Sequence, residues 1–228
     1  MVAVIGDIHG CFYTLLELYQ IIIKNYPGIK VYTVGDLVDR GNNSYQVIDF
    51  IKKNNILFTP GNHDYMFYHF FKDPTSIFAR SWVFNGNETT LDSYDAYEGA
   101  VFEHIDIIKG APLYYNLNDC FISHAGISEK YKSLGVHVND DIYPLIDNIK
   151  ADYNNERGVL WTRDKLLNIG KLQVVGHTKH KEITFDEESN AIYIDTGACV
   201  GNKLSAVVID QSEIITTFEV STKLNDII

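Results

Sequence analysis

The chain has 228 residues, of which 46% are hydrophobic and 21% are charged. This balance is typical of a folded protein with one or at most two domains and excludes a disordered chain. The net charge of −11, with no cluster of Lys or Arg, predicts no nucleic-acid-binding surface. The longest apolar stretches, at 21–23 and 206–209, are far too short to span a membrane, so we expect no membrane partner and a cytoplasmic location.

The first 65 residues show a repeating pattern of short apolar runs and helical segments. Strands are expected at 2–5, 31–34 and 56–59, and helices at 11–25 and 44–53. Each strand is followed by glycine and polar residues. This is a βαβ layout, in which polar groups gather at the carboxyl ends of parallel strands, where open α/β sheets place their sites.

The middle of the chain, at about 65–118, is rich in aromatic residues. We expect it to be mainly helical and to fold as a cap over the site, within a single domain that covers residues 1–228. Four of its aromatic residues are expected to pack in the core and not to stack on a ligand: Trp82, Phe84, Tyr94 and Tyr97.

Strand patterns return in the last half of the chain. They lie at 120–123, 172–175, 191–194, 204–209 and 214–220, and the last two resemble a hairpin around 210–212. The first three end in small polar sequences that include His124, His177 and Asp195. The three cysteines are widely spaced with no CxxC pair, which predicts reduced cysteines that serve packing.

Five of the expected strand ends carry residues that bind metals in proteins. They are Asp7 with His9, Asp36 with Asp39, Asn62 with His63, His124, and His177. Asp7 and His9 stand two apart, so in an extended segment both can reach one ion. The mixture of Asp, His and Asn suits manganese, iron or zinc, and the absence of thiolates argues against a closed structural zinc site. The set exceeds what one ion needs, and a carboxylate such as Asp36 can bridge two ions.

Five short strings carry a family resemblance when taken together in order. They are GDIHG (6–10), GDLVDRG (35–41), GNHD (61–64), HAG (124–126) and GHT (176–178), supported by LWTRD (160–164) and YIDTGA (193–198). The chain resembles the phosphoprotein phosphatase family of calcineurin-like metallophosphoesterases, and most of all its compact bacterial and phage members. The resemblance implies an α/β fold (α+β in four layers), with a central β-sandwich of mixed sheets flanked by helices.

The resemblance also implies a role for each matching position. Two divalent cations, expected to be manganese with iron or zinc as alternatives, would be held by Asp7, His9 and Asp36 at the first position and by Asp36, Asn62, His124 and His177 at the second. A hydroxide shared by the two cations would attack the phosphate. His63 would be the general acid, oriented by Asp39, and Arg40 with Arg163 would hold the phosphate.

These roles predict a metal-dependent phosphatase that acts on phosphorylated proteins, at phosphoserine or phosphothreonine, or on small phosphoesters. Two departures leave an alternative open. Many protein phosphatases carry RGNHE where this chain has Pro60 and Asp64, and GNHD also occurs in diadenosine tetraphosphate hydrolases. Those hydrolases typically lack the acidic residue found here as Asp39, which favours the phosphatase. Cleavage of dinucleoside polyphosphates or RNA 5′ ends is the alternative, and an inactive binding module is a third.

Overall fold

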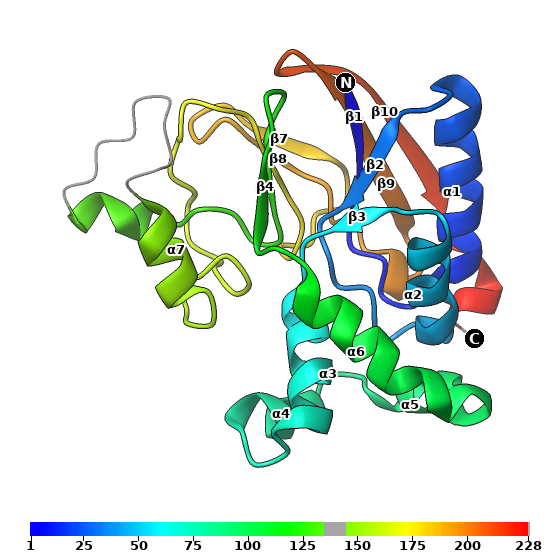
Figure 1. Ribbon diagram of the computed structural model, residues 1–228. Coiled ribbons are helices and arrows are strands. Elements are labelled where there is room, and N and C mark those ends of the chain that lie inside the picture. Colours follow the sequence, from blue (N-terminus) through cyan, green and yellow to red (C-terminus); the bar gives the residue numbers. More distant parts are fainter. Residues whose placement is uncertain (135–144, 228) are drawn as a thin grey trace.

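Two five-stranded mixed sheets form the centre of the molecule in a computed structural model that describes residues 1–134 and 145–227 (Figure 1). The strands are β1 (Val2–Ile5), β2 (Lys30–Thr33), β3 (Leu57–Phe58), β4 (Tyr114–Asn116), β5 (Phe121–Ser123), β6 (Gln173–Val175), β7 (Thr184–Asp186), β8 (Ala191–Tyr193), β9 (Lys203–Asp210) and β10 (Glu213–Ser221). The first sheet has the order β10-β9-β1-β2-β3 and the second β4-β5-β6-β8-β7.

Helices lie outside both sheets (Figure 1). The α-helices are α1 (Phe12–Asn25), α2 (Ser44–Lys53), α3 (Asn62–Lys72), α4 (Ile77–Trp82), α5 (Glu88–Tyr94), α6 (Val101–Gly110) and α7 (Ile146–Asp152). Short 3₁₀ turns lie at η1 (Asp95–Ala100), η2 (Glu129–Leu134), η4 (Ala198–Val200) and η5 (Leu224–Asp226). Within the described ranges, no helix is long and apolar enough to cross a membrane.

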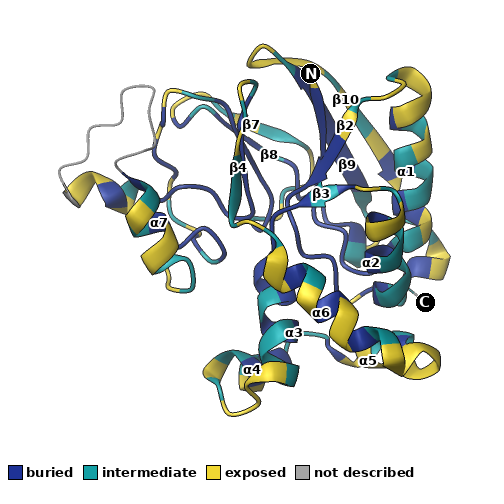
Figure 2. Cartoon of the chain, viewed as in Figure 1, coloured by how far each residue is buried: buried dark blue, intermediate teal, exposed yellow. Residues whose placement is uncertain are grey.

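Strand β1 explains how the layers form, because its side chains are buried on both faces (Figure 2). Val2 and Val4 pack between the two sheets, against residues of β5, β6 and β8. Ala3 and Ile5 point the other way, into a cluster that includes Leu15 of α1. The period of two along a strand produces this division. The result is the four-layer arrangement of helices, sheet, sheet and helices, which confirms the predicted fold class.

The βαβ order of the first 65 residues is confirmed. Strands β1, β2 and β3 are parallel neighbours, so their carboxyl ends meet at one edge. The predicted hairpin of the last two strands is also confirmed as β9 and β10, which pair antiparallel. Its turn residues Gln211 and Ser212 both take positive φ values of 49° and 66°.

The middle segment differs in part from what its sequence predicts. It is helical from α3 to α6 and ends at Gly110, but the expected helical region to residue 118 contains strand β4, which pairs with β5. Trp82 and Tyr94 are buried as predicted, whereas Phe84 is 87% exposed and Tyr97 is 44% exposed. The prediction of a core position was therefore wrong for Phe84 and Tyr97.

All three cysteines are free.

Candidate metal centre

A cavity of about 210 Å³ lies at the carboxyl edge of the two sheets and is lined by five of the six predicted metal ligands. These are Asp7, His9, Asp36, Asn62 and His177, and the other lining residues are Arg40, His63, Asn85, Trp161, Arg163 and Asp195. The sixth ligand, His124, is fully buried, and its Nε2 lies 3.1 Å from Oδ1 of Asn62. The six predicted ligands, which come from five distant parts of the chain, thus meet at one place.

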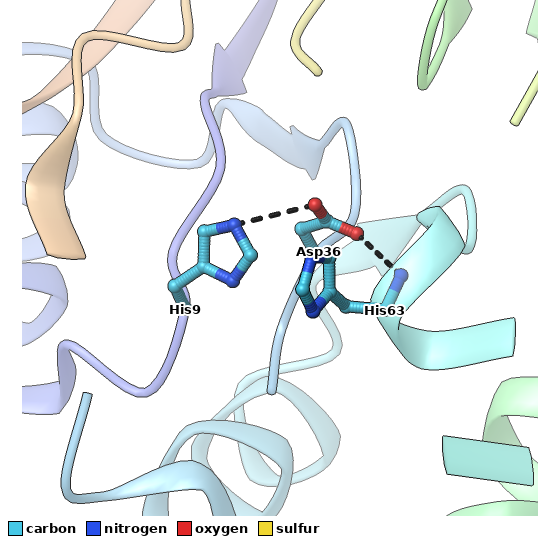
Figure 3. Close-up of side chains that lie close together, drawn as sticks. All are labelled: His9, Asp36 and His63. Atoms are coloured by element: carbon cyan, nitrogen blue, oxygen red, sulfur yellow. Dashed lines mark hydrogen bonds and ion pairs between the residues drawn. The ribbon is translucent and has the colours of Figure 1, made fainter. Parts of the chain in front are cut away.

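Asp36 lies between the two halves of this cluster. Its Oδ2 is 3.3 Å from Nε2 of His9, and its Oδ1 is 3.5 Å from Nε2 of His124. Oδ1 also accepts a hydrogen bond of 3.0 Å from the backbone N–H of His63 (Figure 3). The two carboxylate oxygens therefore face two different histidines, which is the geometry that a bridging ligand requires.

The side chains of Asn62, His124 and His177 bring three acceptor atoms together without a proton between them. The Nδ1–H of His124 donates to Val34 O at 2.8 Å, and the Nε2–H of His177 donates to Trp161 O at 3.2 Å. The remaining ring nitrogens lie 3.2 Å from each other, and that of His177 lies 2.9 Å from Oδ1 of Asn62. Since three lone pairs at this distance repel one another, the donor set fits a cation.

The protonation states of His124 and His177 agree with metal ligation. Burial, with help from His124 and Arg163, lowers the pKa of His177 to about 2. Burial also lowers the pKa of His124, although Asp36 opposes this. Both imidazoles are therefore neutral at physiological pH, as ligands must be.

The buried carboxylates point to the same conclusion. Burial raises the pKa of Asp7 well above its ordinary value, and Asp195 and Asp36 raise it further. Burial alone would raise the pKa of Asp36 too, but His124, His63 and His9 lower it well below the ordinary value. Burial of the carboxylates of Asp7, Asp36 and Asp195 close together costs free energy unless positive charge lies beside them.

Two overlapping groups of buried side chains could each hold an ion. One comprises His9, Asp36 and His63, and the other Asp36, His124 and His177, with their ligand atoms all within 4.8 Å of one another in each group. Asp36 is common to both. The described residues thus contain two buried His/Asp sites that suit a binuclear metal centre.

Buried hydrogen bonds through Asp39 hold the imidazole of His63 from its Nδ1 side. The Nδ1–H donates to Oδ2 of Asp39 at 2.6 Å. Asp39 also accepts hydrogen bonds from the indole of Trp82, at 2.8 and 3.0 Å, and from the hydroxyl of Thr90, at 2.8 Å. The Asp39 carboxylate is therefore fixed from the end of α4 and from α5, and it orients the ring so that Nε2 faces the cavity.

The two predicted phosphate-binding arginines both line the cavity. Arg40 donates from Nη1 to Nε2 of His9 and from Nη2 to Nε2 of His63, each at 2.9 Å. Arg163 donates from Nη1 to the backbone oxygen of His177 at 3.2 Å. The contact between Arg40 and Nε2 of His9 must be broken before that nitrogen can ligate a metal.

The backbone is strained where it presents these side chains. His9, Asp36, Asp39, Arg40 and His177 all have positive φ values, between 45° and 74°. Such values are unfavourable for residues other than glycine and persist only where the surrounding structure holds them. The left-handed conformation turns the chain sharply after each strand and sends the side chain back toward the cavity.

Two glycines make room for carboxylate ligands. A Cβ atom at Gly61 would lie 2.0 Å from Oδ1 of Asp36, and one at Gly176 would lie 1.8 Å from Oδ1 of Asp7. Both contacts are far inside van der Waals distance. The glycines in GNHD and GHT are therefore required by the close approach of the ligands.

Of the two departures from the protein-phosphatase pattern, Asp64 has a clear structural role, and Pro60 lies away from the cavity of the predicted ligands. Asp64 is buried and accepts hydrogen bonds from the backbone N–H groups of Gly61 at 2.8 Å and Leu37 at 2.9 Å, so it joins the start of α3 to the loop that carries Asp36. Pro60 lines a different cavity of about 400 Å³. Among the described residues, Arg40 and Arg163 are the cationic side chains that line the cavity of about 210 Å³ around the predicted ligands (the metal cavity).

Sequence reasoning gave no role to three residues of the cavity. Asp195 follows β8 in the string DTG, so its position after a strand was a usable signal. Trp161 lies in the string LWTRD, next to the expected Arg163. Asn85 follows α4 in the aromatic-rich segment and had no sequence signal. The bonds from Trp82 and Thr90 to Asp39 were likewise not predicted.

Comparison with known proteins places the chain among relatives that match most of its length. A family model described as calcineurin-like phosphoesterase matches residues 1–208. The bis(5′-nucleosyl)-tetraphosphatase PrpE (asymmetrical) of Anoxybacillus flavithermus is 31% identical over 237 residues, which cover 93% of this chain and 92% of that protein. A protein of the same name from Bacillus cereus (strain Q1) is 28% identical over 244 residues, with the same coverage.

A solved structure shares the fold at lower sequence identity. The cold-active protein-tyrosine phosphatase of a psychrophilic Shewanella species superimposes with a TM-score of 0.62 at 18% identity, covering 97% of this chain and 80% of that one. The family match, the fold and the two buried His/Asp groups agree with one another. The chain belongs to the calcineurin-like phosphoesterase family and is a metal-dependent phosphoesterase.

Proposed function

We propose that this protein hydrolyses dinucleoside polyphosphates, with diadenosine tetraphosphate as the representative substrate. The observation that carries the proposal is the similarity to proteins named bis(5′-nucleosyl)-tetraphosphatase, which reaches 31% identity over nearly the full length of both chains. The sequence alone favoured a protein phosphatase and kept this activity as the alternative. The similarity to these relatives favours the dinucleoside polyphosphate over the phosphorylated protein as substrate.

The proposed metal ligands are the six side chains expected from the sequence. Asp7, His9 and Asp36 would hold one cation, and Asp36, Asn62, His124 and His177 the other. His63, although it lies close to His9 and Asp36, would not be a ligand, because its bond to Asp39 suits it to proton transfer. When bound, two divalent cations neutralise phosphate oxygens and lower the pKa of water. Mixed nitrogen and oxygen donors suit manganese, iron or zinc, and we propose manganese for the first assays.

The substrate phosphate would be held by Arg40 and Arg163, because the planar guanidinium matches two phosphate oxygens at once. His63 would donate a proton from Nε2 to the departing oxygen. Its Nδ1–H bond to Asp39 leaves Nε2 as the atom that faces the cavity and stabilises the protonated ring. A departing phosphate oxygen of an anhydride is far less basic than a serine alkoxide, so it depends less on this proton.

The test compares two substrates with the same enzyme and metal. Purified protein with Mn²⁺ is assayed on diadenosine tetraphosphate and on a phosphoserine peptide, and nucleotide products are separated by chromatography. We expect the dinucleotide to be cleaved with the higher kcat/KM. Asymmetrical cleavage, as in the names of the relatives, would release a mono- and a triphosphate. Turnover of the peptide without turnover of the dinucleotide would reject the proposal.

A protein phosphatase is the second candidate, and one observation favours it. His63 and Asp39 form a buried pair at 2.6 Å, and such an acid is most useful for a basic alkoxide leaving group. The phosphopeptide arm of the same assay measures this activity. Comparable kcat/KM values on both substrates would assign the protein both activities.

A further inference from the structure

A second, larger cavity of about 720 Å³ adjoins the metal cavity. Asn85, Trp161 and Arg163 line both, so the two spaces meet at these residues. Most of the residues that line the larger cavity belong to α4 or to the 154–164 segment that follows α7. A ligand held at the metal cavity can therefore extend directly into it.

The sizes of the two cavities suggest different parts of one ligand. Cavities that bind small organic molecules usually measure about 300–1,000 Å³. The metal cavity, at about 210 Å³, falls below this range and suits a phosphate group with its cations. The adjoining cavity, at about 720 Å³, has room for a larger organic group.

The lining of the larger cavity combines aromatic faces with amides. The rings of Phe78 and Trp161 have centroids 5.9 Å apart and planes inclined by 31°. Asn85 and Asn154 supply amide groups nearby. Aromatic faces stack on planar rings, and amides donate to and accept from the polar edges of such rings.

The charges along this cavity favour a neutral group over an anionic one. Lys130 is paired with Asp164 at 3.0 Å, and Glu156 adds another negative charge. Arg163, where the two cavities meet, has no carboxylate partner at ion-pair distance among the described residues. A phosphate is thus attracted to the junction, while the space beyond it suits an uncharged planar ring.

We propose that this aromatic cavity, lined by Phe78, Trp161 and the neighbouring amides, binds the nucleoside attached to the phosphate under attack. The inference rests on the proposed function and extends it by assigning the base a subsite. The base stacks on Phe78 and Trp161, and Arg163 holds the phosphate where the cavities meet. Ile77, which is 65% exposed, also lines this cavity.

The first test measures inhibition and does not depend on cleavage of a dinucleotide. AMP and inorganic phosphate are compared as competitive inhibitors of p-nitrophenyl phosphate hydrolysis by the full-length protein with Mn²⁺. We expect AMP to inhibit at a concentration about tenfold or more below that of phosphate, since base stacking on one aromatic residue has this size of effect. Equal inhibition constants for AMP and phosphate in the wild type would overturn the inference.

The variant Phe78→Ala tests whether the base stacks on Phe78. The ratio of the two inhibition constants should shift toward one in this variant, and the KM for diadenosine tetraphosphate should rise about tenfold. Phe185→Ala is the matched control, because Phe185 is a 46% exposed phenylalanine on β7 that does not line the cavity. An unchanged ratio in soluble Phe78→Ala would overturn the inference.

A second variant keeps the test valid if Phe78→Ala does not fold. Because Ile77 is largely exposed, Ile77→Glu leaves the core intact, and it replaces an apolar part of the larger cavity, which the base of AMP reaches and free phosphate does not, with a charged side chain. It should weaken AMP inhibition more than phosphate inhibition, and equal weakening would count against the subsite. Failure of the wild type to cleave diadenosine tetraphosphate, with strong AMP inhibition retained, would reject the proposed function and leave a nucleotide subsite. Cleavage of diadenosine tetraphosphate by both variants, with the KM of the wild type, would reject the subsite and leave the proposed function standing.

Discussion

The strand-end cavity and the helical segment beside it, α3 to α6, are built in different ways. Around the metal cavity, His9 and His124 each bond a backbone oxygen, and both are at most 2% exposed. In the helical segment, the side chains that face the larger cavity include the exposed Ile77 and the half-buried Phe78. The first region is fixed by the main chain of two sheets, and the second by side-chain packing of short helices.

This difference assigns separate tasks to the two regions. Ligands and acids must be held within fractions of an ångström, which rigid strand ends provide. The group attached to the phosphate can be recognised by surfaces that vary without disturbing the chemistry. Helix α3 joins the two regions, because its first residues Asn62 and His63 belong to the cavity while Met66 lines the larger one.

The largest effect is expected from Asp36→Asn, which removes the charge of the side chain common to both ion groups and replaces one of its two ligand oxygens by an amide nitrogen. Turnover of every substrate should fall by more than the about 10–100-fold typical of losing an outer partner of a metal ligand. Metal analysis should show fewer than two ions per chain. Asp92→Asn, on the exposed face of α5, is the control. Two tightly bound ions in Asp36→Asn would contradict the bridging role.

His63→Asn should separate proton transfer from metal binding. We expect both ions to be retained and turnover to fall about 10²–10⁴-fold on substrates with basic leaving groups. The loss should be smaller on diadenosine tetraphosphate, whose leaving group is a weaker base. Rates on phenyl phosphate and on the dinucleotide measure the contrast. Equal losses on both substrates would show that His63 does not act as the acid.

Arg163→Lys tests the point where the two regions meet. The variant keeps the charge but loses the planar fork, and a charge-assisted hydrogen bond is worth about 1.5–3 kcal/mol. The KM for diadenosine tetraphosphate should therefore rise about tenfold to a hundredfold, as steady-state kinetics would show. Lys171→Arg, at a lysine that bonds Asn116 and Leu117 far from the cavity, is the control. An unchanged KM in Arg163→Lys would remove Arg163 from phosphate binding.

The smallest effect concerns the stability of the helical segment and its pH dependence. His104 of α6 is buried and forms a 2.7 Å hydrogen bond with the hydroxyl of Tyr94, and burial lowers its pKa below the ordinary 6.5. The unfolded chain therefore binds a proton more readily. The stability that neutral His104 confers is present above pH 6.5 and is lost as the pH falls below it.

His104→Gln should reduce this dependence. Glutamine can still bond Tyr94 but does not titrate, so the loss of stability between pH 7 and 5 should be smaller than in the wild type. Urea unfolding at several pH values measures the difference, and the cost at pH 7 should be about 1 kcal/mol. Parallel pH profiles for the two proteins would show that His104 does not contribute.

The helical segment also shows where sequence patterns lose information. Phe84 and Tyr97 are aromatic and were expected in the core, yet both are exposed, because short helices joined by turns have no single buried stripe. Strands β4 and β7 are three-residue edge strands of the second sheet and were not predicted. Such strands exist only because a neighbour pairs with them, and no local pattern records that neighbour.

The sequence by itself determined the central strands, the fold class and the six side chains that we propose as metal ligands. It could do so because each of these six residues follows a buried strand within a few positions, and five of them stand directly beside a glycine in the sequence. Only the tertiary structure decided that Trp82 and Thr90 hold Asp39, that Asp195 joins the cavity, and that a larger cavity opens beside it. These features depend on distances between segments far apart in the chain, which packing of the layers sets and local sequence does not.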